Sequence, residues 1–168
     1  MELKSTTRFE KVPISIWKVF GKPVTIDEFI EEGSRCVDAI GFRDALRSLD
    51  GRLWQKLESI NAEEYPDLPE AVQVIIQALE SPEAQQAKDP PRWLAEVAFG
   101  ARYLLKRFDL IADHLPEIGL ADDTQLLARI LERNHLELGC HFARQPRHGP
   151  LDKAGARSAG LHARRLGR

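Results

Sequence analysis

Residues 89–134 read DPPRWLAEVAFGARYLLKRFDLIADHLPEIGLADDTQLLARILERN, and they indicate an architecture more clearly than any other part of the chain. Apolar residues recur at helical spacing over 93–108 and again over 126–138. The segment between them, 109–121, contains Pro116, which interrupts a helix, and Gly119. The stretch therefore predicts two amphipathic helices joined by a compact turn.

Short motifs in this stretch follow an order that resembles the YkvA-like domain, a small helical domain of unknown function found in many bacterial proteins. They are Tyr103-Leu104, Asp109-Leu110-Ile111-Ala112-Asp113, the step from Pro116 to Gly119, and the pair Asp122-Asp123. The resemblance implies a helical hairpin with a polar turn over 89–139, and it implies no established reaction. Many members have a more apolar first helix than this chain, which carries Glu96, Arg102, Lys106 and Arg107 there.

Residues 25–88 predict an N-terminal layer of helices that packs against this hairpin. Thr25 and Glu28 have the spacing of a capping box, in which each side chain binds a backbone N–H at the start of a helix. Apolar residues then follow helical spacing over 26–40, 42–60 and 72–79.

The two parts together predict a single compact all-α domain of five or six helices in two layers. Residues 1–24 are expected to be an irregular N-terminal segment, because their apolar residues fit a short strand and one helical turn equally well. Gly139 is expected to end the last core helix. Residues 140–168 then form a basic tail that is mobile or only locally helical.

The charge distribution separates an acidic body from the basic tail. Residues 141–168 hold seven Lys/Arg and one acid, a net charge of +6, whereas the chain as a whole has −2. Such a cluster predicts contact with an anionic membrane surface or nucleic acid, and the alternative is a solvated tail. The basic residues concerned are Arg144, Arg147, Lys153, Arg157, Arg164, Arg165 and Arg168.

Four aspartates around the predicted turn, Asp109, Asp113, Asp122 and Asp123, have two readings. Asp122 with Gln125 has the spacing of a second capping box, and capping with salt bridging is the favoured interpretation. The alternative is a hard cation such as Mg²⁺ or Ca²⁺ held by converging carboxylates. No other cofactor is predicted.

Other pairs of polar residues match chemical motifs only in part. Glu132 and His135 give a single Glu-x-x-His, whereas di-iron bundles need two. His135, Cys140 and His141 with Cys36 match no closed zinc spacing, so a helix end with incidental His and Cys is favoured.

No Gly-rich phosphate loop or nucleophile motif is found in the sequence. The chain also has no window with the roughly 18 apolar residues of a membrane span, no signal-peptide core in its first 15 residues and no disulfide framework. We therefore expect a cytoplasmic protein, peripheral to a membrane at most. Its predicted role is a non-enzymatic helical interaction or scaffold module that binds a protein partner or itself, with no small-molecule substrate. The alternative is a metal-dependent or metal-regulated protein.

Overall fold

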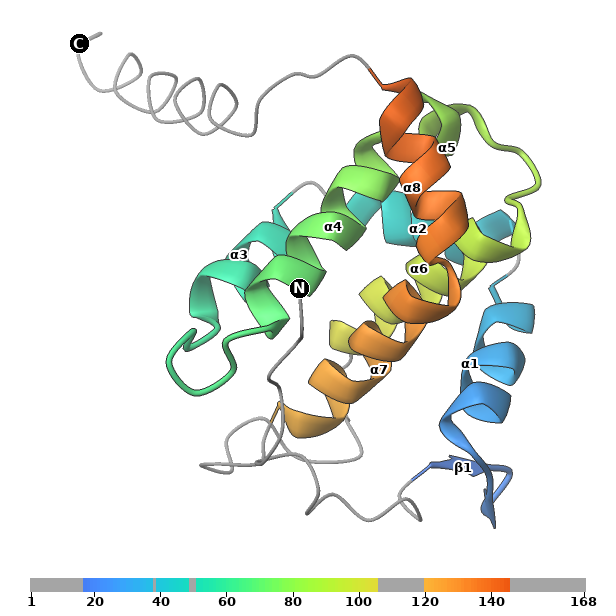
Figure 1. Cartoon of the computed structure of the whole chain (residues 1–168). Coiled ribbons are helices and arrows are strands. Elements are labelled where there is room, and N and C mark those ends of the chain that lie inside the picture. Colours follow the sequence, from blue (N-terminus) through green and yellow to red (C-terminus); the bar gives the residue numbers. More distant parts are fainter. Residues whose placement is uncertain (1–16, 38, 49–50, 106–119, 146–168) are drawn as a thin grey trace, which may run out of the picture.

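The computed structural model describes residues 17–37, 39–48, 51–105 and 120–145, and these form a compact helical domain (Figure 1). The predicted all-α class is confirmed. Within the described residues there are eight helices and one β-hairpin. Its two strands, β1 (Lys18–Val19) and β2 (Lys22–Pro23), have two residues each. The helices are α1 (Ile26–Arg35), α2 (Ala39–Ser48), α3 (Arg52–Ser59), α4 (Leu68–Glu80), α5 (Pro82–Gln86), α6 (Arg92–Leu104), α7 (Ala121–Arg133) and α8 (His135–Arg144).

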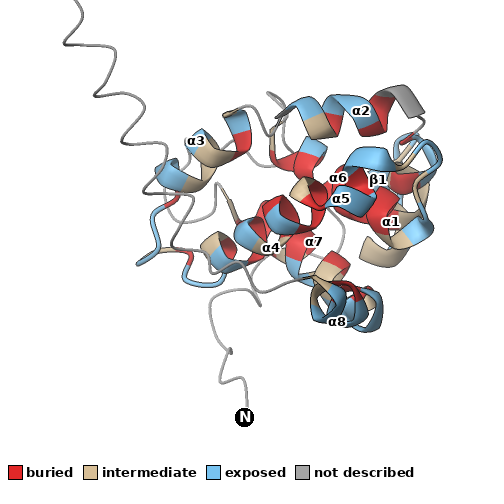
Figure 2. Ribbon diagram, turned by 90° about the horizontal axis from the view of Figure 1, so that it is seen from above, coloured by how far each residue is buried: buried red, intermediate tan, exposed pale blue. Residues whose placement is uncertain are grey.

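The helices surround α6 rather than forming the two layers that the sequence predicts. α6 packs against α1, α2, α4 and α7, and of residues 94–104 every one except Arg102 is buried. Figure 2 shows the buried residues gathered where α6 lies among its neighbours. A helix enclosed on all sides needs small residues to let its neighbours approach, and Ala95, Ala98 and Ala101 meet that need.

Two glycines allow the closest of these helix contacts. A Cβ at Gly100 of α6 would lie 2.9 Å from a methyl of Leu127 and 3.0 Å from one of Ile130, both on α7. A Cβ at Gly33 of α1 would overlap the ring of Phe99 on α6. The packing of α1 and α7 against α6 therefore depends on these two missing side chains.

The chain is divided into more helices than the expected five or six because the helices break at additional points. The segment 26–40 is split between α1, which ends at Arg35, and α2, which starts at Ala39. Gly51, with φ of +137°, separates α3 from α2. Ser81 caps α5 by accepting the N–H of Ala84. At Asn134, α7 ends and α8 begins.

The predicted helix end at Gly139 is wrong. Gly139 lies inside α8, which continues to Arg144, so the first residues assigned to the tail are helical. Glycine in a helix interior costs about 1 kcal/mol relative to alanine, and packing of the neighbouring Leu138 and His141, both buried, outweighs that penalty.

The capping box predicted at the start of the first helix is confirmed. The Thr25 hydroxyl accepts the N–H of Glu28, and the Glu28 carboxylate accepts the N–H of Thr25 at 2.7 Å. No helix among the described residues is long and apolar enough to cross a membrane.

Candidate functional site

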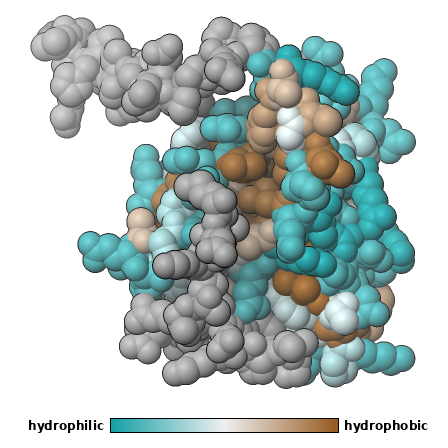
Figure 3. Space-filling model, viewed as in Figure 1, coloured by the Kyte–Doolittle hydropathy of each residue, from teal (hydrophilic) through white to brown (hydrophobic). Residues whose placement is uncertain are grey.

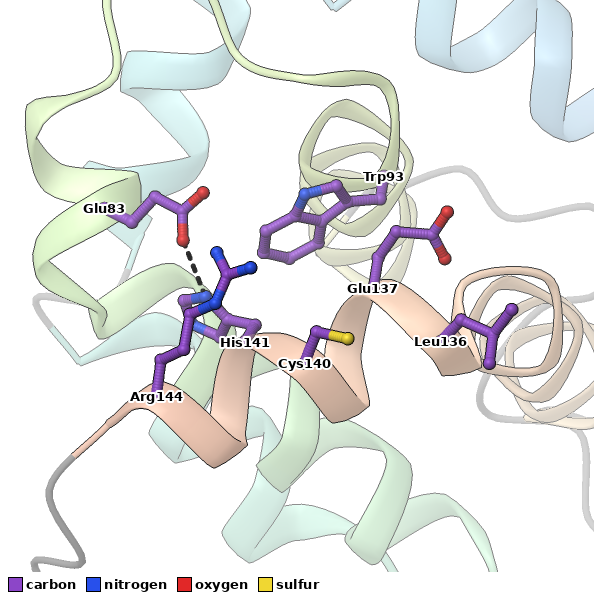
Figure 4. A pocket seen from close by; sticks show the side chains of 7 residues that line it. All are labelled: Glu83, Trp93, Leu136, Glu137, Cys140, His141 and Arg144. Atoms are coloured by element: carbon purple, nitrogen blue, oxygen red, sulfur yellow. Dashed lines mark hydrogen bonds and ion pairs between the residues drawn. The ribbon is translucent and has the colours of Figure 1, made fainter.

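A shallow hollow of about 260 Å³ lies where α5, the start of α6 and α8 meet (Figure 4). Its lining combines apolar, aromatic, acidic and basic side chains: Glu83, Trp93, Leu136, Glu137, Cys140, His141 and Arg144. We call this the α8 hollow. It is the strongest candidate for a contact site because it lies beside an exposed apolar side chain.

That side chain is Leu136, which is 67% exposed on the first turn of α8. The half-buried indole of Trp93 lies in the same hollow, and Cys140 next to it is exposed. Figure 3 shows apolar side chains gathered over α8 and between α8 and α4, with hydrophilic residues around them. An apolar centre with a charged rim is the usual composition of a protein–protein contact.

The floor of the hollow is His141, which is only 5% exposed. Its Nδ1 lies 2.8 Å from a carboxylate oxygen of Glu83, and its Nε2 lies 2.9 Å from the side-chain amide nitrogen of Gln145. These distances fit an Nδ1–H that donates to Glu83 and an Nε2 that accepts from Gln145. The ring of Trp93 packs against the imidazole with centroids 5.1 Å apart.

This arrangement does not make Cys140 and His141 a nucleophile and its base. Successive residues of a helix point about 100° apart, and Figure 4 shows the thiol directed away from the imidazole and Glu83. Both imidazole nitrogens also have partners already. Cys140 and His141 therefore do not form a thiol–imidazole pair.

A buried carboxylate, Glu96, forms the centre of an ion-pair network that joins α1, α6 and α7. Glu96 is 1% exposed and accepts four hydrogen bonds: one from Arg92, two from Arg133 and one from Asn134 at 2.7 Å. Arg92 and Arg133 also bind Glu31 of α1 at 3.2 and 3.3 Å. A buried charge is tolerated only with such partners, so this network fixes the positions of the three helices.

Asp27 extends the network at the surface. Arg129 binds both carboxylate oxygens of Asp27 at 2.8 Å, and Arg133 binds one of them at 3.0 Å. These hydrogen bonds lower the pKa of Asp27 from 3.8 to about 2, and the bond from Arg129 has the largest effect. Burial of the carboxylate acts in the opposite direction. Hydrogen bonds to Asp27 and Glu132 raise the pKa of Arg129. Burial lowers the pKa of Arg133, but hydrogen bonds to Glu96 and Asp27 outweigh it and raise that pKa as well.

The prediction that Asp122 caps a helix with Gln125 is wrong. The N-cap of α7 is Leu120, which makes no side-chain cap, and Asp122 is the second residue of the helix. Asp122 and Asp123 are both fully buried, and the Tyr103 hydroxyl donates to Asp122 at 2.6 Å. The helix starts two residues earlier than a cap at Asp122 requires, so the carboxylate lies in the core and accepts the Tyr103 hydroxyl of α6.

Two of the four residues of the predicted cation site, Asp122 and Asp123, lie in the described part of the chain. Asp109 and Asp113 lie outside the described residues, and within the described ranges no three His, Cys, Asp or Glu side chains come together to hold a metal ion. The zinc set of Cys36, Cys140 and two histidines is not assembled. Cys36 is an exposed residue after α1, and His141 binds Glu83.

The remaining predicted site residues separate in the structure. Glu132 binds Arg129, and the Nδ1 of His135 lies 2.8 Å from the backbone carbonyl of Glu132, so the Glu-x-x-His pair forms no shared site. Of the seven basic tail residues, Arg144 is exposed on the last turn of α8 and lines the hollow. The other six lie outside the part of the chain that the structure describes.

Sequence reasoning missed the α8 hollow as a unit. Leu136 lies outside the apolar face of the predicted last helix, and this is the one feature of the sequence that indicates an exposed apolar side chain there. No local pattern connects Glu83 with His141, which are 58 residues apart.

No protein-family profile, curated protein sequence or solved structure matches this chain. The YkvA-like resemblance therefore stays a prediction.

Proposed function

We propose that this protein is a non-enzymatic helical interaction module, YkvA-like in its 89–139 segment, whose contact with a protein partner or a second copy is made by the α8 hollow. The observation that supports this most directly is the 67% exposure of Leu136 beside a half-buried tryptophan. A large apolar side chain in this position is stabilised when a partner removes it from water.

The rim of the hollow gives such a contact its selectivity. Glu83 and Glu137 supply negative charge and Arg144 supplies positive charge around the apolar centre. Opposite charges at the rim orient a partner and exclude one whose charges do not match. The buried imidazole of His141, held by Glu83, keeps the floor of the hollow in one position.

The two cysteines allow a matched experiment. A photoreactive label on Cys140, in the Cys36→Ser background, should cross-link to a partner or to a second copy in host lysate. The same label on Cys36, in the Cys140→Ser background, is the control, because Cys36 is also exposed but lies outside the hollow.

A substitution links the captured species to the hollow. Leu136→Glu should abolish the Cys140 cross-link, because it places a negative charge at the position where the partner would bury the leucine side chain. Equal cross-linking from both cysteines, or cross-linking that survives Leu136→Glu, would contradict the proposal. Sedimentation as a strict monomer with no captured partner would contradict it as well.

A further inference from the structure

The β1–β2 hairpin carries at its tip an aromatic residue that folding does not require. Val19 pairs with Lys22, so Phe20 and Gly21 are the two turn residues. Both have positive φ, +48° at Phe20 and +77° at Gly21. A two-residue turn with positive φ at both positions is of type I′ and favours Asn-Gly, because a bulky residue in the left-handed region is strained.

The side chain of Phe20 is also exposed almost completely. At 94% exposed it exceeds every other large hydrophobic side chain among the described residues. An asparagine at this position would relieve the backbone strain and would expose less apolar surface to water. Neither local conformation nor packing in the isolated chain therefore explains the phenylalanine.

The tip is held in a fixed position by the residue at the base of the hairpin. Trp17 is 2% exposed, and its ring centroid lies 5.0 Å from that of Phe29 on α1 and 6.3 Å from that of Tyr103 on α6. The Val24 N–H donates to the Trp17 carbonyl at 2.9 Å. In Figure 1 the hairpin extends beyond the start of α1, at the opposite end of the domain from α8.

Both strands place a cation beside the aromatic tip. Lys18 and Lys22 are exposed, and residues 17–26 contain no acid. The next acids along the chain already have partners, since Asp27 binds Arg129 and Glu28 binds Thr25. An aromatic tip between two lysines thus carries a local charge of opposite sign to the acidic body.

We propose that the β1–β2 hairpin docks on an anionic lipid bilayer surface, with Phe20 entering the headgroup region and Lys18 and Lys22 binding lipid phosphates. A single convex tip needs no complementary pocket, which favours a fluid bilayer over a protein partner. An aromatic ring is stable at the boundary between headgroups and acyl chains, and nearby lysines add attraction to anionic lipid. This contact is separate from the α8 hollow and does not depend on the function proposed for it.

The test compares binding of the full chain and four variants to vesicles of phosphatidylcholine with about 30% phosphatidylserine, at low salt. Phe20→Asn should raise the melting temperature by about 2 °C or more, because it relieves turn strain, while vesicle binding falls at least about fivefold. Lys18→Gln with Lys22→Gln should lower binding by roughly thirtyfold, from about 1 kcal/mol per lysine.

Leu136→Asn is the matched control, because it also replaces an exposed apolar side chain by asparagine but does so on α8 rather than on the hairpin. It should leave vesicle binding unchanged. A Phe20→Trp variant should keep vesicle binding. Its tryptophan fluorescence should be quenched by brominated lipid more than that of the unsubstituted chain. Purely electrostatic adsorption through the basic tail would not produce this added quenching.

Several results would overturn the proposal. They are no binding of the full chain at low salt, equal binding of the full chain and Phe20→Asn, and the absence of added quenching in Phe20→Trp. Loss of the Cys140 cross-link in Phe20→Asn, with vesicle binding intact, would instead identify the hairpin as a protein contact. The other results do not alter the Cys140 cross-linking outcome, so for them the two proposals fail independently.

Discussion

Substitution of Glu96 by glutamine should destabilise the domain more than its small chemical change suggests. In the native network one carboxylate oxygen accepts from Arg92 and Arg133, and the other accepts from Arg133 and Asn134. A glutamine has one acceptor oxygen and one NH₂ group. Whichever way the glutamine amide is turned, its NH₂ group faces two of the N–H donors that the carboxylate oxygen accepted in the native chain.

The size of the effect follows from burial and from the partners that remain. Breaking a buried ion pair costs about 3–5 kcal/mol when the other charge is left without compensation. Here Arg133 keeps its bonds to Asp27 and Glu31, and its side chain is 16% exposed. We therefore expect a loss of about 2–4 kcal/mol of unfolding free energy, which lowers the melting temperature by about 5–15 °C.

Urea unfolding followed by helical circular dichroism measures this loss, since the midpoint should fall by roughly 1–2 M for a slope of about 2 kcal/mol per M. Glu132→Gln is the control, because Glu132 is 70% exposed and binds Arg129 at the surface. It should cost about 0.5 kcal/mol or less. Equal midpoints for the two variants would refute the view that Glu96 holds α1, α6 and α7 together.

Four further substitutions and the addition of a divalent cation test other parts of the structure. Asp27→Asn should cost about 1 kcal/mol at pH 7, a value reduced by solvent screening because Asp27 is 37% exposed. Because its pKa falls from 3.8 to about 2 on folding, this contribution is complete above pH 4 and disappears towards pH 2. The urea midpoints of variant and native chain should therefore converge over that range, and a gap independent of pH would contradict the assignment. Gly33→Ala should destabilise by about 1–3 kcal/mol through overlap with Phe99, whereas Gly139→Ala, with open space around it, should stabilise by about 0.5–1 kcal/mol in the same unfolding assay. Asp122→Ala should cost about 1–3 kcal/mol, since it removes the acceptor of a buried hydroxyl, and millimolar Mg²⁺ or Ca²⁺ should leave the melting temperature of the native chain unchanged. A rise of many degrees would instead support the cation hypothesis.

The helical class could be predicted because it rests on local periodicity. The Thr25 capping box and the apolar spacing of 93–104 each depend on residues within a few positions of one another. The central position of α6 could not be predicted in the same way. It depends on Gly33 and Gly100, whose role appears only when α1 and α7 are packed against α6.

The candidate sites were largely hidden in the sequence for a related reason. In the sequence Glu96 is only a charge that makes its helix less apolar, yet it is buried because Arg133 and Asn134, 37 and 38 residues away, supply its partners. Asp122 fitted a capping motif, yet Tyr103 on another helix binds it. In each case a long-range partner changed the role that local spacing indicated.

The Glu96 network also connects the two proposed contact surfaces, and this has a testable consequence. Arg133 binds Asp27 and Glu31 of α1, which carries Phe29 and so supports the hairpin through Trp17. Asn134 donates to Glu96, and α8 begins at the following residue. Loosening at Glu96 should therefore weaken both surfaces, although neither contains it.

We accordingly expect Glu96→Gln, assayed well below its melting temperature, to reduce vesicle binding and Cys140 cross-linking together. Phe20→Asn should reduce only the first, and Leu136→Glu should reduce only the second. The comparison depends on the folded fraction, so circular dichroism must show Glu96→Gln to be folded under the conditions of both assays. If folded Glu96→Gln binds vesicles and cross-links as the native chain does, the hairpin and α8 are held by their local packing alone. The network would then contribute to stability without positioning either surface.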